Sequence, residues 1–162
     1  VLGTQNSVMK NGQSFPLRVK SEDREVIANL DNSNFEISNG TVMFWIDFDA
    51  GNSIQVDNSG FGNNNGYRLK SHIKIFSRNS SGRIDGKVLP LAADPIIKAV
   101  IGTDTATAIP DDDDGEFKIV GLTAGTYKII IDGQNGYSDT LIQNVIVRNR
   151  EDTHLPLITL HQ

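Results

Sequence analysis

The sequence predicts an all-β chain made of tandem β-sandwiches. Short stretches of alternating apolar and polar residues recur along the 162 residues, and clusters of Gly, Asn and Asp separate them. Few windows carry apolar residues at the i, i+3, i+4 and i+7 spacing of a helix, so we expect little helix. Hydrophobic residues make up 38% and charged residues 22%, a balance typical of a globular chain.

The composition excludes several function classes. Cysteine is absent, which removes disulfides, thiol nucleophiles and cysteine-ligated metals. The three histidines, His72, His154 and His161, argue against a multi-histidine metal site. The net charge of −5 argues against a nucleic-acid partner. No run of ~18 apolar residues is present that could span a membrane as a helix.

A polar stretch near the middle of the chain is the predicted domain boundary. The segment 77–82 reads Ser-Arg-Asn-Ser-Ser-Gly and divides the chain into residues 1–78 and 79–162, the first and second halves. The first half is neutral, and the entire net charge lies in the second half. Because only about six residues lack strand character, we expect a compact hinge rather than a long tether.

The clearest strand of the first half covers residues 41–49. Its alternation places Trp45 and Asp47 on one face and an apolar stripe on the other. We predict that this stripe is core: it consists of Val42, Phe44, Ile46 and Phe48. Further strands are expected over residues 14–19 and 67–76, with a loop over 59–66.

The second half contains a denser and more regular strand pattern. Seven short strands in ~80 residues is the density of an immunoglobulin-like or transthyretin-like (prealbumin-like) sandwich. The predicted strands cover 83–88, 96–101, 117–119, 127–131, 137–142, 145–147 and 155–160.

Residues 82–150 resemble the carboxypeptidase regulatory-like domain, a transthyretin-like sandwich. The resemblance is carried by Gly82-Arg-Ile-Asp-Gly-Lys-Val88, Ala99-Val100, Asp114-Gly-Glu-Phe117, Gly121-Leu-Thr-Ala-Gly-Thr-Tyr127, Gly136-Tyr137 and Asn144-Val145. In this pattern Gly115 takes a positive φ, Phe117 enters the core and Tyr127 anchors the returning strand. The fold class is grouped with starch-binding-like modules, so the resemblance implies carbohydrate binding.

Residues 1–76 resemble the C-terminal part of an uncharacterised domain of bacterial surface lipoproteins. The matching residues are Leu2-Gly3, Asn6-Ser-Val8, Asn11-Gly12, Phe15-Pro-Leu17, Asp47-Phe-Asp-Ala50, Ser53-Ile54 and Tyr67-Arg-Leu-Lys70. In that family a longer segment with a lipoprotein signal comes first, and we expect such an upstream part before Val1. The resemblance implies an extracytoplasmic location, at the outer membrane, the cell surface or the periplasm, with membrane attachment only through a lipid anchor on that upstream part.

An acidic turn in the second half is the candidate metal site. Four adjacent carboxylates, Asp111, Asp112, Asp113 and Asp114, precede Gly115 and repel one another. Calcium, which binds oxygen ligands, is the one cofactor this turn suggests. The spacing of an EF-hand is not met, so we favour a solvated turn before a core Phe, with no cofactor.

Two further features bear on chemistry. Asp47 and Asp49 share a strand face and could act as an acid–base pair or a metal site, or they could hydrogen-bond loop backbone near Ser53. We favour the structural role and predict no enzymatic activity. Trp45, Phe61 and Tyr67 are the candidate ligand-stacking rings, because sugar-binding proteins use exposed rings beside polar groups.

We therefore predict a non-enzymatic binding module of a bacterial surface lipoprotein. Its partner would be a glycan or a surface protein, and at least two coplanar exposed aromatic rings near polar side chains would favour the glycan. The alternative is a structural spacer or cell-adhesion segment with no small-molecule site, which a rigid interface between the domains and the absence of a concave aromatic patch would favour.

Overall fold

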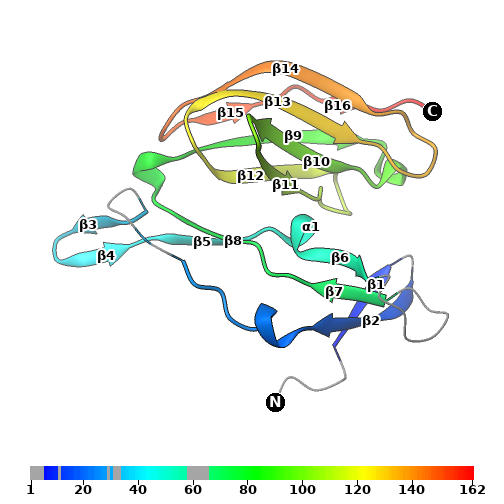
Figure 1. Cartoon of the computed structure of the whole chain (residues 1–162). Helices are drawn as coiled ribbons and strands as arrows, with labels where there is room; N and C mark the ends of the chain where they lie inside the picture. The colour runs from blue at the N-terminus through cyan, green and yellow to red at the C-terminus, as the bar shows by residue number, and fades with distance from the viewer. Residues whose placement is uncertain (1–5, 11, 29, 31–33, 58–65) are drawn as a thin grey trace.

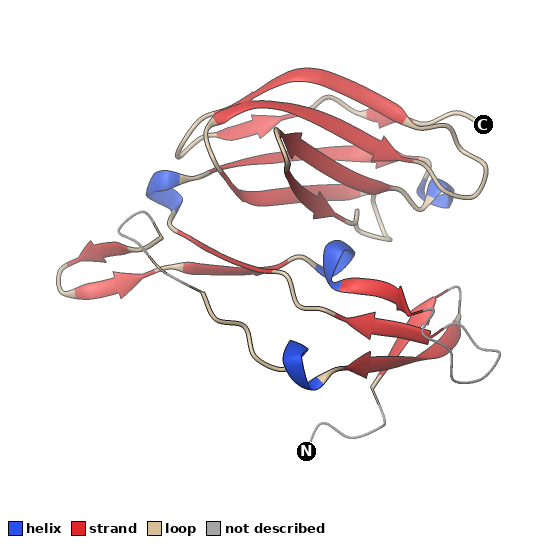
Figure 2. Cartoon of the chain, in the orientation of Figure 1, coloured by secondary structure: helices blue, strands red, loops and turns tan. Residues whose placement is uncertain are grey.

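The computed structural model describes residues 6–10, 12–28, 30, 34–57 and 66–162. Strands dominate the described part, and its helices are single short turns (Figure 2), which confirms the all-β prediction. The helical turns are η1 (Ser21–Asp23), α1 (Ala50–Ser53), η2 (Arg78–Ser80) and η3 (Leu91–Ala93). No helix in this part of the chain is long and apolar enough to cross a membrane.

Each sheet takes its strands from one side of residues 78–80 (Figure 1). In the first half the strands are β1 (Ser7–Lys10), β2 (Gln13–Val19), β3 (Glu36–Ser38), β4 (Thr41–Met43), β5 (Trp45–Phe48), β6 (Ile54–Asp57), β7 (Gly66–Leu69) and β8 (Ile73–Phe76). In the second half they are β9 (Gly82–Leu89), β10 (Ile96–Ile101), β11 (Asp104–Ala108), β12 (Glu116–Leu122), β13 (Gly125–Asp132), β14 (Thr140–Val147), β15 (Asp152–His154) and β16 (Ile158–Thr159).

The second half is a sandwich of two sheets. One sheet has the order β11-β10-β13-β14, and the other the order β12-β9-β15, with β16 also paired to β9. Alternate residues from both sheets meet in one core. The predicted core residues Phe117 and Tyr127 are both 4% exposed, and Gly115 takes a φ of +78° as expected.

Several strand assignments in the second half need correction. The predicted strands 137–142 and 145–147 merge into β14, which begins at Thr140, because Asn144 takes a positive φ of 60° within it and does not end it. Of the predicted strand 155–160 only Ile158–Thr159 is a strand, and β15 was not predicted. The strand β11 was not predicted, since its Asp-Thr-Ala-Thr-Ala sequence has no large apolar residue to mark a buried face.

The first half forms three small sheets, of order β1-β2-β7-β6, β3-β4 and β5-β8. The predicted strand 67–76 is broken into β7 and β8, which belong to different sheets. Ser53 causes the break, since its carbonyl accepts from Lys70 N–H at 2.8 Å and its Oγ accepts from His72 N–H at 2.8 Å. The buried Ser53 thus accepts hydrogen bonds from backbone N–H groups between β7 and β8, so these groups are not used in strand pairing.

The core predicted for the first half is wrong. Val42, Phe44, Ile46 and Phe48 are 47–64% exposed, although they alternate as expected. Among the described residues, every buried apolar side chain lies at Ile84 or beyond. The alternation correctly groups residues on one face, but no second layer of the described chain covers that face.

Candidate functional site

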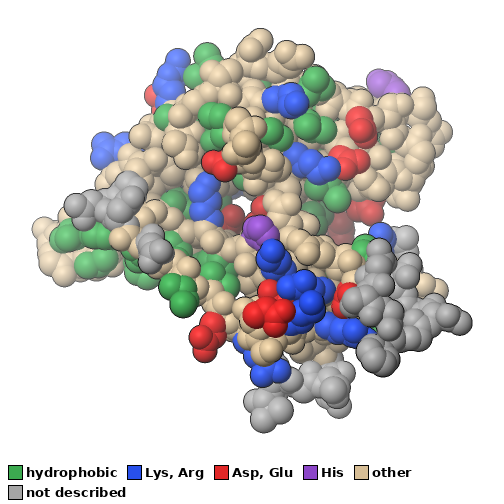
Figure 3. Space-filling view, in the orientation of Figure 1, with side chains coloured by type: hydrophobic (Ala, Val, Ile, Leu, Met, Phe, Trp, Pro, Cys, Tyr) green, Lys and Arg blue, Asp and Glu red, His purple; other side chains and the backbone are tan. Residues whose placement is uncertain are grey.

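The two halves meet where Phe76 packs on Gly121. Gly121 has a φ of +65°, and a Cβ placed there would lie 2.5 Å from Phe76 Cδ1. Only glycine therefore allows the ring this close to the β12 backbone. Figure 3 shows the molecule hollowed between the two halves, with charged side chains around the hollow. Two cavities lie at this junction, and Val120 lines both of them.

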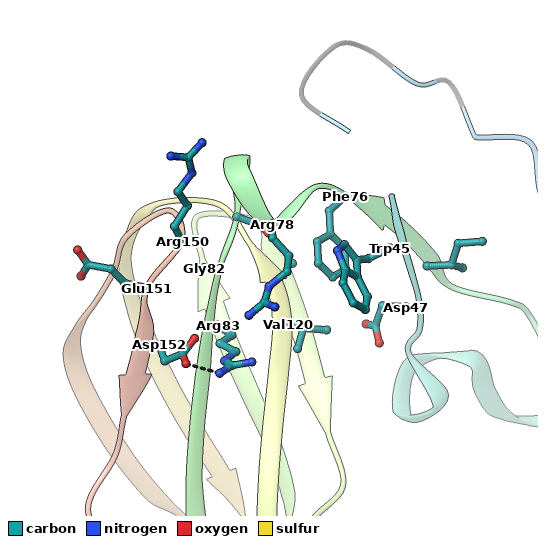
Figure 4. Close-up of a pocket in the computed structure, with 13 residues that line it drawn as sticks. Trp45, Asp47, Phe76, Arg78, Gly82, Arg83, Val120, Arg150, Glu151 and Asp152 are labelled. Carbon is teal, nitrogen blue, oxygen red and sulfur yellow. Dashed lines mark hydrogen bonds and ion pairs between the residues drawn. The ribbon is translucent and has the colours of Figure 1, made fainter. Parts of the chain in front are cut away.

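The first cavity, the Trp45 pocket, has a volume of about 190 Å³. Strand β5 contributes Trp45, and β8 contributes Phe76, which is the cross-strand partner of Trp45. Directly paired residues of an antiparallel ladder point to the same face, so both rings face the second half. Figure 4 shows them side by side, with Arg78, Arg83 and Asp152 across the pocket.

Charged groups hold the pocket in shape. The Arg78 guanidinium lies over the Trp45 ring, 5.8 Å from its centroid, a cation–π geometry. Arg83 donates through a terminal guanidinium nitrogen to Asp152 and forms an ion pair with it. Trp45 nevertheless stays 51% exposed. The site therefore combines an accessible ring with fixed hydrogen-bonding groups.

Sequence reasoning found Trp45 but missed its charged neighbours. Arg78 lies in the stretch that we interpreted only as a hinge. Arg83 and Asp152 are 69 residues apart and meet because β15 runs parallel to β9, with Asp152 opposite Arg83. No local pattern signals a parallel pairing over that distance, so nothing in the sequence links the two residues.

The candidate ring Tyr67 is not part of this pocket. Tyr67 lies on β7, where its ring meets Phe15 edge-on at a centroid distance of 5.4 Å. It belongs to a different sheet from Trp45 and does not line the pocket. Phe61 lies outside the described residues. Of the two predicted rings that the structure describes, Trp45 lies at a cavity between the halves and Tyr67 does not.

The second cavity, the charged cavity, has a volume of about 440 Å³ and is lined by Asp47, Lys74, Asp104 and Tyr127, among others. Burial and the neighbouring carboxylate of Asp49 raise the pKa of Asp47, which Lys74 partly offsets. Burial lowers the pKa of Lys74 despite the attraction of Asp47 and Asp104. For both side chains, the loss of solvation on burial therefore shifts the pKa more than the attraction of the opposite charge does.

Asp49 has a structural role, as the sequence suggested. Its carboxylate caps α1, accepting from Asn52 N at 3.0 Å and from Asn52 Nδ2 at 2.9 Å. It also accepts from Thr107 N at 3.1 Å and from Thr107 Oγ1 across the junction. Burial alone would raise the pKa of Asp49, but these hydrogen bonds lower it. With four donors already bound, this carboxylate is poorly suited to acid–base chemistry.

Two carboxylates of the acidic turn bind its own backbone. Asp111 Oδ1 accepts from Asp113 N, and Asp114 Oδ1 accepts from Glu116 N, both at 2.8 Å. These are the local hydrogen bonds by which Asp stabilises turns. In the part of the chain that the structure describes, no three His, Cys, Asp or Glu side chains are grouped to hold a metal ion. Calcium binding by Asp111, Asp112, Asp113 and Asp114 stays a prediction.

Comparison with family models and with curated proteins assigns no family to this chain. No family model matches it, and no curated protein matches it. Neither the lipoprotein resemblance nor the carboxypeptidase regulatory-like resemblance gains support from these two comparisons. Both stay predictions from the residues that carry them.

Solved structures give weak similarities. Two are interface mutants of the type II cohesin–X-dockerin complex from Acetivibrio cellulolyticus. The C-terminal interface mutant is 25% identical to this chain, with a TM-score of 0.39. The N-terminal interface mutant is 23% identical, with a TM-score of 0.38. Each covers 49% of this chain and 56% of that chain. The third, the minor pilin GBS52 of Streptococcus agalactiae, is 16% identical over 60% of this chain and 50% of its own, with a TM-score of 0.35.

The chain thus spans about half the length of the structures it matches. At these TM-scores the similarities carry no functional argument. The function is therefore argued from the residues of this chain.

Proposed function

We propose that this chain is a non-enzymatic, extracytoplasmic binding module whose Trp45 pocket holds a single sugar unit of a glycan. The observation that carries the proposal is the half-exposed Trp45 ring in a cavity that also presents the Arg83–Asp152 pair. A sugar has an apolar face that stacks on an aromatic ring and hydroxyls that need donors and acceptors. The pocket supplies both kinds of contact.

The size of the pocket favours one ring. Pockets for drug-sized ligands measure roughly 300–1,000 Å³, whereas this cavity measures about 190 Å³. A longer glycan would therefore insert one residue and leave the remainder in solvent. With one exposed ring at the site, we expect weak monovalent binding, with a Kd of about 1 mM.

The pocket is also formed in advance of binding. Strand pairing fixes the backbone of Trp45 and Phe76, and Arg78 restrains the indole from over one part of its ring. Asp152 restrains Arg83, so its guanidinium requires little further ordering when a hydroxyl binds. Because ordering flexible side chains opposes binding, this arrangement favours a small ligand that makes few contacts.

The structural spacer is the second candidate function. The spacer interpretation is favoured by the direct contacts between the two halves, where Phe76 packs on Gly121 and Asp49 accepts hydrogen bonds from Thr107. A spacer has no need of an accessible ring in a cavity, however, and the spacer interpretation leaves the exposure of Trp45 unexplained. We therefore rank sugar binding first.

A glycan array followed by titration tests the proposal. The chain is displayed as a tetramer on streptavidin, because multivalent display raises weak affinities by roughly 10²–10⁴-fold. Glycans that bind are then titrated against the monovalent protein, with the single tryptophan of the chain, Trp45, as the fluorescent reporter.

Two variants decide the outcome. Trp45→Ala should abolish array binding, and Leu141→Ala should retain it. Leu141 is a matched control, since it is apolar and 50% exposed against 51% for Trp45, but lies on β14, away from the pocket. An array with no specific binding by folded protein, or equal loss in both variants, would refute sugar binding at this site.

A further inference from the structure

An unusual apolar surface covers the side of β5 opposite the Trp45 pocket. We call it the outer face, and its residues are Ile37, Val42, Phe44, Ile46, Phe48 and Ile73. Trp45 and Asp47, which alternate with these residues along the strand, line cavities against the second half. Successive side chains of a strand point to opposite faces, so the side chains of Ile46 and Phe48 point away from the second half. Ile46 and Ile73 also lie at the edges of the two cavities.

Strand pairing groups these residues into two pairs, one in each of two small sheets. Ile37 is paired with Val42, and Phe48 with Ile73. The two strand pairs β3-β4 and β5-β8 also lie end to end, because Asn79 N, just after β8, donates to Glu36 Oε1 on β3 at 2.9 Å. Figure 3 shows hydrophobic side chains gathered over the β3-β4 hairpin.

The exposure of the outer face is large for a solitary chain. Its six side chains are 38–69% exposed. Taking roughly 200 Å² for a large side chain, they present about 600 Å² of apolar surface. The largest apolar patch on a typical monomer is roughly 300–600 Å². The outer face therefore lies at the upper end of this range, where such patches are often functional.

We propose that a second copy of this chain packs its own outer face against this one, about a twofold axis. The two apolar sheets would form the layers of a sandwich, with sheets about 10 Å apart as in other β-sandwiches. The alternation along residues 41–49 has the pattern of a core strand. In the dimer β4 and β5 would be core strands, because each copy supplies the layer that the other lacks.

Charge and area both favour a second copy as the occupant. In a twofold interface the same patch meets itself, so any charge on it would face a like charge. All six residues of the outer face are uncharged. Two copies together would bury roughly 1,200 Å², above the ~1,000 Å² expected of a stable interface. The second half lies on the other side of β5 and does not obstruct the approach.

Sedimentation velocity over about 1–100 µM protein tests the dimer. This range brackets the micromolar dissociation constants common for interfaces near the lower size limit. The unmodified chain should sediment at twice its mass of 17.7 kDa at the upper concentrations. Ile46→Asp should weaken the dimer at least about tenfold, because it places two carboxylates in an apolar contact.

Ile146→Asp is the matched control. Ile146 is an exposed isoleucine on β14, 52% exposed against 64% for Ile46, and lies outside the outer face. This variant should dimerise like the unmodified chain. Since both positions are exposed, both variants should fold, and circular dichroism verifies this before sedimentation.

A crosslinking experiment gives an independent result. The chain has no cysteine, so Ile46→Cys introduces the only thiol. A short bis-maleimide should convert this variant to a covalent dimer and leave Ile146→Cys mostly monomeric. A protein that is monomeric at every concentration would overturn the proposal and leave the outer face to another polypeptide. A dimer unaffected by Ile46→Asp would also overturn it.

Discussion

Asp49 in the first half and Thr107 in the second half are joined through both oxygens of one carboxylate. Thr107 donates its backbone N–H to Oδ2 at 3.1 Å and its hydroxyl to Oδ1. The same two oxygens accept from Asn52, which lies within the turn α1. One side chain therefore both caps a helical turn and links the two halves, so its removal should affect the whole chain.

We expect Asp49→Asn to destabilise the folded chain at neutral pH by about 1–2 kcal/mol, the usual cost of a lost cap or buried hydrogen bond. An amide has one acceptor oxygen, so two of the four donors lose their partner. Urea unfolding monitored by circular dichroism measures the difference.

The pH dependence of this difference has a defined sign. The hydrogen bonds lower the pKa of Asp49 in the folded chain below its ordinary value of 3.8. The folded state thus binds this proton less tightly than the unfolded state, and the stabilisation is present above pH 3.8 and lost as the pH falls through the folded pKa. The difference in the free energy of unfolding between the unmodified chain and Asp49→Asn should therefore become smaller below about pH 4.

The control for this measurement is Asp112→Asn, an exposed position on the acidic turn, which should change stability little. A gap that stays constant down to pH 3 would contradict the assignment.

Gly121→Ala should destabilise the chain more than Gly102→Ala. Both glycines have a positive φ, +65° and +56°, so both substitutions incur a backbone cost of about 1–2 kcal/mol. A Cβ at Gly102 meets nothing within 4 Å, whereas one at Gly121 would lie 2.5 Å from Phe76 Cδ1. This clash should add about 1–3 kcal/mol.

Thermal unfolding of the two variants measures the difference between them. Gly121→Ala should cost less stability in a Phe76→Ala background than in the unmodified chain, since the clash is absent there and only the backbone cost remains. Equal losses at Gly121 and Gly102 would mean that Phe76 moves aside freely and that the junction is not tightly packed.

Local alternation predicted the second half well because two layers of the same half cover its strands. Phe117 and Ile119, or Tyr127 and Ile129, face a sheet formed within some 80 residues, so the pattern and the burial coincide. For Phe44 and Ile46 the same alternation correctly predicted that the two side chains share a face, but it wrongly predicted that they are buried. A pattern of period two records which residues share a face, and the presence of a covering layer depends on the rest of the fold or on a partner.

The candidate site was predictable only in part, for a related reason. Trp45 could be selected because it lies opposite the apolar stripe. The pairing of its neighbours Arg83 and Asp152 depends on the register of β15 against β9. The contact between Gly121 and Phe76 depends on how the two halves pack together. Such contacts between distant segments are set by packing, and composition or spacing does not encode them.

Tyr127→Phe should cost about 1 kcal/mol of stability, the usual value for one hydrogen bond. The Tyr127 hydroxyl donates to the carbonyl of Thr123 at 2.9 Å, four residues earlier, and ties the start of β13 to the preceding turn. Chemical unfolding measures the loss. Tyr137→Phe is the control, since the described part of the chain shows no hydrogen bond of the Tyr137 hydroxyl, and it should be nearly neutral. A neutral Tyr127→Phe would show that water replaces the bond without cost.

The contact between Arg78 and Trp45 predicts how charged and neutral quenchers reach the indole. Trp45 is the only tryptophan and is 51% exposed, so its fluorescence should be quenched readily by both iodide and acrylamide. The Arg78 guanidinium, 5.8 Å from the ring centroid, should attract iodide and raise its local concentration. Arg78→Gln should therefore lower the Stern–Volmer constant for iodide, and added salt should reduce the difference between the two proteins by screening.

Acrylamide is the neutral control for this effect. Its Stern–Volmer constant should stay the same or rise slightly, because Arg78 no longer covers the ring. A parallel fall for both quenchers would mean that the substitution closes the pocket, and equal iodide constants would mean that Arg78 does not stay over the ring in solution.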